Sequence, residues 1–178
     1  MINEFSVSPK PQNQKARSIM LVMFLLSGII IATSFSLEKY RGVISSFSLL
    51  TLTVALLLYT KYISVKYYYE IMIDDDGVPL FLVRQSVGKR SSLLCRIELS
   101  SIVQVEKENA AMRKKHKKAD DAFSYSYCPT LFPENTIRLY VVGYRAKSEI
   151  VIEGNDEFAS LLIDYAKTAK EMSRQDEE

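Results

Sequence analysis

The sequence predicts an α+β protein in which a two-helix transmembrane hairpin is followed by an antiparallel β-barrel capped by a C-terminal α-helix. Three observations predict this fold class: two long uncharged runs, a later region in which apolar and polar residues alternate, and a final run with helical spacing of apolar residues. The chain has 178 residues, a net charge of +2 and a mean hydropathy of +0.00. These averages alone would indicate one ordinary soluble domain, so the prediction depends on how the residues are distributed.

The two uncharged runs predict membrane spans. They cover Ser18–Leu37 and Gly42–Thr60. A helix of about twenty residues spans roughly 30 Å, the thickness of a bilayer's hydrocarbon core. The polar residues within the runs are mainly Ser and Thr, which membrane helices tolerate, whereas the core helices of a soluble bundle usually carry charges on their outer face. We therefore expect spans at 18–37 and 43–62, joined by a short loop at 38–42.

The charges that flank the runs predict their orientation. Only Lys39 and Arg41 are basic in the loop, whereas five basic residues flank the other ends of the runs: Lys10, Lys15, Arg17, Lys61 and Lys66. The positive-inside rule then places the N-terminal segment 1–17 and the C-terminal part in the cytoplasm. Two cysteines without a CxxC spacing agree with a reducing compartment.

Small residues within the spans predict how the two helices pack. Gly28 and Ala32 are four residues apart in the first span, and Thr51 and Ala55 have the same spacing in the second. Small residues at this spacing let helix backbones approach closely. We therefore expect these four residues to lie at the helix–helix contact.

From Tyr67 onward the apolar residues recur with a period of two, which predicts short strands. Asp74-Asp75-Asp76-Gly77 is typical of a turn. Asn155 is a good N-cap, and apolar residues from Phe158 to Met172 share one helical face. We expect a domain at 67–173 and a tail at 174–178, with seven strands around Tyr67–Ile73, Leu80–Val83, Leu93–Leu99, Val103–Val105, Phe123–Tyr127, Ile137–Val141 and Ile150–Ile152.

This order of elements resembles the bacterial pleckstrin-homology-like (PH-like) domain family of small two-span membrane proteins. The resemblance rests on five stretches: Tyr67–Asp74, the Asp76-Gly77 turn, Cys95–Ile102, Asn135–Val142 and Asn155–Phe158. It implies a PH-like barrel whose strand edges and helix end bind other molecules. The chain departs from lipid-binding PH domains of signalling proteins, because its first hairpin carries three Asp residues instead of a basic cluster and it contains no Trp.

The composition excludes several kinds of chemistry. One histidine cannot form a two-histidine metal site or a histidine relay, and two distant cysteines make no zinc or redox motif. With six glycines, neither GxGxxG nor GxxxxGK[ST] occurs. We therefore predict no enzyme activity, no catalytic residues, no metal site and no cofactor.

One local feature stands out as a candidate binding site. Residues 67–178 contain 16 basic and 19 acidic residues, a net charge of −3, yet five positive charges fall within six residues: Arg113, Lys114, Lys115, Lys117 and Lys118. A solvated loop with paired acids, contact with anionic lipid, and contact with an acidic protein or nucleic acid are all compatible with such a run. Nucleic acid is the least favoured, since the run is short and the rest of the domain is acidic.

These observations predict a membrane-anchored PH-like adaptor that binds a protein partner, or assembles with copies of itself, at the cytoplasmic face of the cell membrane. The first alternative is a sensor of anionic lipid surfaces that uses Arg113–Lys118. The second is a membrane enzyme or its accessory subunit, which the missing catalytic motifs disfavour. No nucleic-acid partner is expected.

Overall fold

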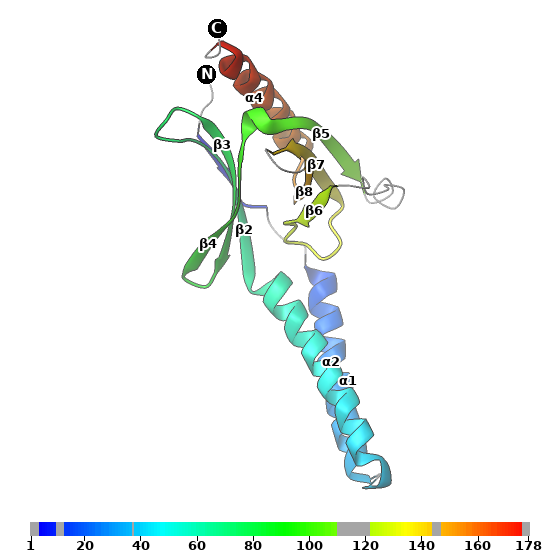
Figure 1. The fold of residues 1–178 in the computed structure, drawn as a ribbon. Coiled ribbons are helices and arrows are strands. Elements are labelled where there is room, and N and C mark those ends of the chain that lie inside the picture. The colour runs from blue at the N-terminus through cyan, green and yellow to red at the C-terminus, as the bar shows by residue number, and fades with distance from the viewer. Residues whose placement is uncertain (1–3, 10–12, 37, 110–121, 144–146, 176–178) are drawn as a thin grey trace. The chain divides into compact units, whose positions relative to one another are not determined.

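The computed structural model describes residues 4–9, 13–36, 38–109, 122–143 and 147–175. Its contacts divide the chain into two compact units. One unit comprises Pro11–Val65, and the other comprises Met1–Lys10 together with Lys66–Glu178. The second unit therefore contains one segment that precedes the first unit in the sequence and one that follows it (Figure 1).

The unit Pro11–Val65 consists of two long helices. α1 covers Gln14–Ser36 and α2 covers Arg41–Leu58, with a single 3-10 turn, η1 (Glu38–Tyr40), between them. A π-helical turn, η2 (Tyr59–Ile63), prolongs α2. Gln14–Ser36 and Arg41–Ile63 are 23 residues long each and contain 18-residue windows with mean hydropathies of 2.3 and 1.9, so both are long and apolar enough to cross a membrane. Most of their large apolar side chains are exposed, as a lipid environment would allow.

Small residues with a seven-residue repeat line the contact between α1 and α2. Ser27 and Ser34 are buried on α1, and Ser48 and Ala55 are buried on α2. The Ser27 and Ser48 hydroxyl oxygens lie 2.9 Å apart, within hydrogen-bond distance. Small side chains let the backbones approach, and a hydroxyl pair between helices stabilises their association in an apolar medium.

The predicted packing face of α1 is wrong. Gly28 and Ala32 are exposed, and a Cβ atom added to Gly28 would meet no atom within 4 Å. The contact follows Ser27 and Ser34 because their seven-residue spacing matches the repeat on α2. For α2 the prediction was better, since Ala55 is buried and Thr51 is half-buried.

The second unit contains two four-stranded sheets (Figure 1). In the first sheet the order is β1-β2-β3-β4, from β1 (Phe5–Val7), β2 (Val65–Ile73), β3 (Pro79–Val87) and β4 (Arg90–Glu98). β1 pairs antiparallel with β2, so that Phe5 faces Ile71 and Val7 faces Tyr69. A segment before α1 thus completes a sheet whose other strands follow α2.

In the second sheet the order is β5-β7-β8-β6. A 3-10 turn, η3 (Leu99–Ser101), leads from β4 into β5, and the strands cover Ile102–Asn109 (β5), Phe123–Ser126 (β6), Asn135–Val142 (β7) and Lys147–Glu153 (β8). β7 is antiparallel to both β5 and β8, whereas β6 runs parallel to β8.

The closed antiparallel barrel predicted from the sequence is wrong for the described residues. The coarser prediction is confirmed, because an α+β arrangement of two apolar helices, sheets and a C-terminal helix is present. Within the described chain the strands form two separate four-stranded sheets, with η3 between β4 and β5, and β6 joins the second sheet through parallel pairing with β8.

The core between the sheets is built around Tyr69. Its side chain is fully buried, and its ring lies 6.0 Å from that of Phe158 and 6.5 Å from that of Phe81. The Tyr69 hydroxyl donates to the carbonyl of Tyr127 (2.8 Å) and accepts from the backbone N–H of Glu153 (3.2 Å). One side chain of the first sheet is therefore hydrogen-bonded to segments that belong to the second.

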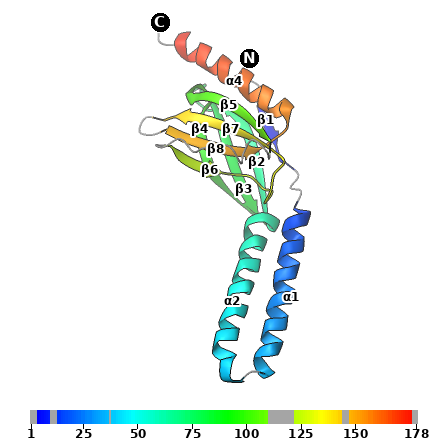
Figure 2. The ribbon, with the colours of Figure 1, turned by 90° about the vertical axis from the view of Figure 1, so that its right-hand side faces the viewer.

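The C-terminal helix α4 covers Asp156–Gln175 and packs against η3 and β5 (Figure 2). The predicted N-cap is present, since the backbone N–H of Phe158 donates to Asn155 Oδ1 at 3.0 Å. Phe158, Leu162 and Ala169 of the predicted apolar face are buried, whereas Met172 is exposed. The helix is therefore amphipathic, with its buried face directed at the core.

Candidate functional site

The basic residues predicted as a binding site lie outside the residues that the structure describes. These are Arg113, Lys114, Lys115, Lys117 and Lys118. Their role stays a prediction from the sequence. The described residues contain three other features that could carry function: a buried polar cluster, a small pocket and an exposed strand edge.

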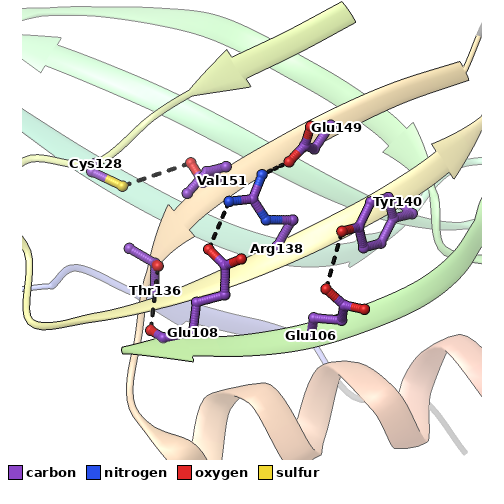
Figure 3. Close-up of polar contacts among 8 residues, drawn as sticks. All are labelled: Glu106, Glu108, Cys128, Thr136, Arg138, Tyr140, Glu149 and Val151. Carbon is purple, nitrogen blue, oxygen red and sulfur yellow. Dashed lines mark hydrogen bonds and ion pairs between the residues drawn. The ribbon is translucent and has the colours of Figure 1, made fainter. Parts of the chain in front are cut away.

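The polar cluster is centred on Arg138 (Figure 3). This arginine of β7 lies between two carboxylates of neighbouring strands, Glu108 of β5 and Glu149 of β8. One guanidinium nitrogen is 2.6 Å from Glu108 Oε2, and the other terminal nitrogen forms an ion pair with Glu149. All three side chains are buried, with exposed fractions of 7% for Arg138, 6% for Glu108 and 1% for Glu149.

The strand register explains how these charges meet. Glu108 faces Thr136, and Glu149 faces Tyr140, so each carboxylate is a diagonal neighbour of Arg138 on the same face of the sheet. The other face carries apolar residues of the core, among them Ile137, Leu139 and Ile150. Strict alternation along β7 thus directs the polar residues to one face and the core residues to the other.

Further hydrogen bonds extend the cluster along the same face. The Tyr140 hydroxyl lies 3.0 Å from Glu106 Oε2, and burial, assisted by this carboxylate, raises the Tyr140 pKa. The Thr136 hydroxyl donates to the Glu108 carbonyl at 3.4 Å. At the edge near β6, the Cys128 thiol donates to the Val151 carbonyl at 3.8 Å (Figure 3).

The geometry of the cluster favours a structural role. Each terminal nitrogen of the guanidinium faces a carboxylate, so Arg138 connects β5, β7 and β8. A buried ion pair adds little net stability over an apolar replacement, but removing one of its partners is costly. Among the described residues, no three His, Cys, Asp or Glu side chains are grouped as a metal site requires.

Sequence reasoning missed this cluster because it treats the polar positions of an alternating strand as solvent-facing. Glu106, Glu108, Arg138 and Glu149 all fit that pattern. The signal that could have revealed the cluster is an arginine in a central strand with acidic residues in two other strands. Using that signal requires knowing the strand order and register.

A small pocket of about 270 Å³ lies where β5 and β7 meet the segment that leads into α4. On one wall Lys107 Nζ is 3.4 Å from Asp156 Oδ1. A side chain at Gly154 would require Ile137 to shift, because an added Cβ would lie 2.6 Å from Ile137 Cδ1. The lining is mixed polar and apolar: Lys107, Glu108, Asn109, Asn135, Thr136, Ile137, Gly154, Asn155 and Asp156.

The third feature is the outer edge of β4. Among the described strands, only β3 pairs with β4, so β4 ends the first sheet as far as the structure describes it. A β-bulge between Leu93 and Cys95 interrupts the pairing, and the two adjacent apolar side chains Leu93 and Leu94 are 51% and 37% exposed. We call Leu93–Glu98 the β4 edge. Unpaired backbone groups beside exposed apolar side chains favour addition of another strand.

Ion pairs occupy part of this region. Arg96 of β4 pairs with Asp74 of the turn after β2, and Arg84 of β3 lies 2.7 Å from Glu70 of β2. The thiol of Cys95 is half-buried, and burial raises its pKa, which keeps it protonated and unreactive near neutral pH. The β4 edge therefore offers backbone and apolar groups and lacks an activated nucleophile.

Comparisons of the chain with protein-family models, with curated proteins and with solved structures found no match in any of the three.

Proposed function

We propose that this chain is a membrane-anchored adaptor that binds a protein partner, or a second copy of itself, at the cytoplasmic face of the membrane. α1 and α2 are the anchor, because their length, hydropathy and exposed apolar side chains fit a bilayer. The unit that contains both sheets and α4 is the part that binds. Five basic flanking residues against two in the loop support the cytoplasmic orientation.

The observation that carries this proposal is the pairing of β1 with β2. β1 precedes α1 and β2 follows α2, and yet Phe5–Val7 is in register with Tyr69–Ile71. Two strands of one sheet lie on the same side of a bilayer. This pairing supports a hairpin anchor, in which the segment between the two strands enters and leaves the membrane at the same face.

Binding by strand addition at the β4 edge is the mode that the geometry supports best. A partner strand would continue the order β1-β2-β3-β4 and would cover Leu93 and Leu94. Backbone hydrogen bonds would supply affinity, and the apolar pair would supply specificity. The element order also supports the proposed relationship to the PH-like family, because strands are followed by a C-terminal amphipathic helix.

Purification of the full chain in mild detergent, with mass measurement of the complex, tests the adaptor proposal. The expected result is a stoichiometric partner or a homo-oligomer. Leu94→Lys should reduce its recovery about tenfold, because the substitution replaces apolar contact by an edge charge, and a tenfold change corresponds to about 1.4 kcal/mol. The control is Met172→Lys on α4, which is 43% exposed against 37% for Leu94. A monomer without partners, or equal losses in both variants, would contradict strand addition at this edge.

Orientation needs a separate measurement. A tag fused after the last residue should be protected from protease in intact cells and cleaved after the membrane is opened. A tag that is cleaved in intact cells would place the sheets outside and overturn the cytoplasmic assignment.

A further inference from the structure

The turn between β3 and β4 carries exposed apolar and basic side chains together. Val87 and Arg90 are paired across this turn, and Gly88 adopts a φ of +61°, which allows the tight reversal. Val87 is 44% exposed, and Lys89 and Arg90 are exposed as well. We call Val87–Arg90 the hairpin tip.

The two ends of this sheet have opposite charge. The turn between β2 and β3 contains Asp74, Asp75 and Asp76, whereas no acidic residue occurs between Asp76 and Glu98. The other two basic residues of that stretch, Arg84 and Arg96, form ion pairs with acids of β2 and the turn that follows it. Within the described part of the chain, Lys89 and Arg90 have no ion pair.

Chain connectivity places the hairpin tip at the end of the sheet where the chain arrives from α2. β2 begins at Val65, directly after η2 and Ser64. β2 and β3 contain nine residues each, and the tight turn between them, closed by Asp74 N–H donating to the Val78 carbonyl at 2.9 Å, makes them a hairpin. The end of β3 is therefore next to the start of β2, where Lys66 adds another exposed positive charge.

We propose that the hairpin tip docks on the anionic phospholipid headgroups of the bilayer that α1 and α2 span. Lys89 and Arg90 contact lipid phosphates, and Val87 enters the interface between headgroups and acyl chains, a combination typical of interfacial membrane contacts. The acidic turn Asp74–Asp76 lies at the other end of the sheet, away from the repelling surface. This contact rests on the proposed membrane anchor but does not require the proposed partner binding, because it uses the tip and leaves the β4 edge open.

The absence of tryptophan from the sequence makes a clean test available. Val87→Trp in the full chain introduces a single indole, and the protein is reconstituted in nanodiscs of phosphatidylcholine alone or with an equal part of phosphatidylglycerol. We expect emission at shorter wavelength, and quenching by brominated lipid, only in the anionic nanodiscs. Both effects should weaken as salt is raised. The control is Ile73→Trp, a 40% exposed position at the acidic end of the same hairpin.

Charge removal tests the role of the two basic residues. Each positive charge near an anionic surface contributes about 1 kcal/mol, which changes the ratio of docked to undocked protein a little more than fivefold. Lys89→Gln/Arg90→Gln in the Val87→Trp background removes two such charges and should lower this ratio about 30-fold. Lys167→Gln/Arg174→Gln, on the exposed face of α4, should leave the ratio unchanged. Unchanged thermal melting confirms that each variant is folded.

Three results would overturn the proposal. The first is equal emission of Val87→Trp in neutral and anionic nanodiscs, and the second is an equal response of Ile73→Trp. The third is a shift that depends on protein concentration and not on lipid charge, which would indicate that the tip contacts another protein. A failed capture experiment at the β4 edge, by contrast, leaves this inference intact.

Discussion

Replacing Arg138 by methionine removes the positive charge that Glu108 and Glu149 share, while keeping most of the side-chain volume. Both carboxylates lose an ion pair in a region where their side chains are 6% and 1% exposed. Arg138→Met should therefore destabilise the sheet unit strongly and leave the packing of α1 against α2 unchanged.

The size of the effect follows from burial. Removing one partner of a buried ion pair costs about 3–5 kcal/mol. Methionine fills most of the space, so the cavity contributes little. For a unit of this size, a loss of 1 kcal/mol lowers the melting temperature by about 4 °C. A loss of about 3–5 kcal/mol should therefore lower the melting temperature by about 12–20 °C.

Thermal unfolding of the full chain in detergent, followed by near-ultraviolet circular dichroism of the tyrosines, measures this decrease. The matched control is Arg84→Met, because Arg84 also pairs with a glutamate of a neighbouring strand but is 43% exposed; a pair of that kind contributes about 1 kcal/mol or less. Adding Glu108→Gln and Glu149→Gln to Arg138→Met should recover part of the loss, since the two buried negative charges are removed as well. Equal melting of the two arginine variants, or no recovery, would refute the reasoning.

Three further predictions concern single contacts, all measured by melting of the full chain. Tyr69→Phe should cost about 1–3 kcal/mol by removing two buried hydrogen bonds. Burial raises the Tyr69 pKa well above its usual value near 10, so as pH rises the unfolded chain loses the Tyr69 proton before the folded chain does. The free energy of unfolding therefore falls as pH rises above about 10. Tyr69→Phe should lack this part of the alkaline loss of stability, and the same alkaline profile in both proteins would contradict the prediction. Gly154→Ala should cost about 1–3 kcal/mol because its Cβ would lie 2.6 Å from Ile137 Cδ1, and a neutral effect would mean that Ile137 moves aside freely. Ser27→Leu should destabilise the packing of α1 against α2 by a similar amount, because Ser27 lies at the contact. Gly28→Leu should have no such effect, since no atom lies within 4 Å of the Cβ position at Gly28. A larger loss for Gly28→Leu than for Ser27→Leu would instead support the packing face expected from the sequence.

Periodicity explains what the sequence predicted correctly. The apolar runs around Phe24 and Val54 predicted α1 and α2 from length and charge alone. The alternating segments predicted β2 to β8, because a strand with one face on a core repeats every two residues. Asn155 predicted the start of α4, because capping is a local interaction.

The missed features depend on contacts between distant segments. β1 has only three residues, too few for a periodic signal, and its pairing partner lies beyond both long helices. The parallel pairing of β6 with β8 has no local sequence signature either. The cluster around Arg138 depends on register, which single-strand patterns do not specify. The elements whose pattern lies within one segment could therefore be predicted from the sequence. The contacts that depend on which strand pairs with which could not.

The pairing of β1 with β2 also has a consequence for biosynthesis. Phe5–Val7 is translated before either long helix, and its partner Tyr69–Ile71 is translated after both. Inserting only one helix across the bilayer would leave the two strands in different compartments, where β1 could not pair and Phe5 could not stack on Phe158 at 5.9 Å. Completion of the first sheet therefore requires that Phe5–Val7 and Tyr69–Ile71 lie on the same side of any membrane that the helices enter, and a chain with the two strands on opposite sides would expose an unpaired β2 edge.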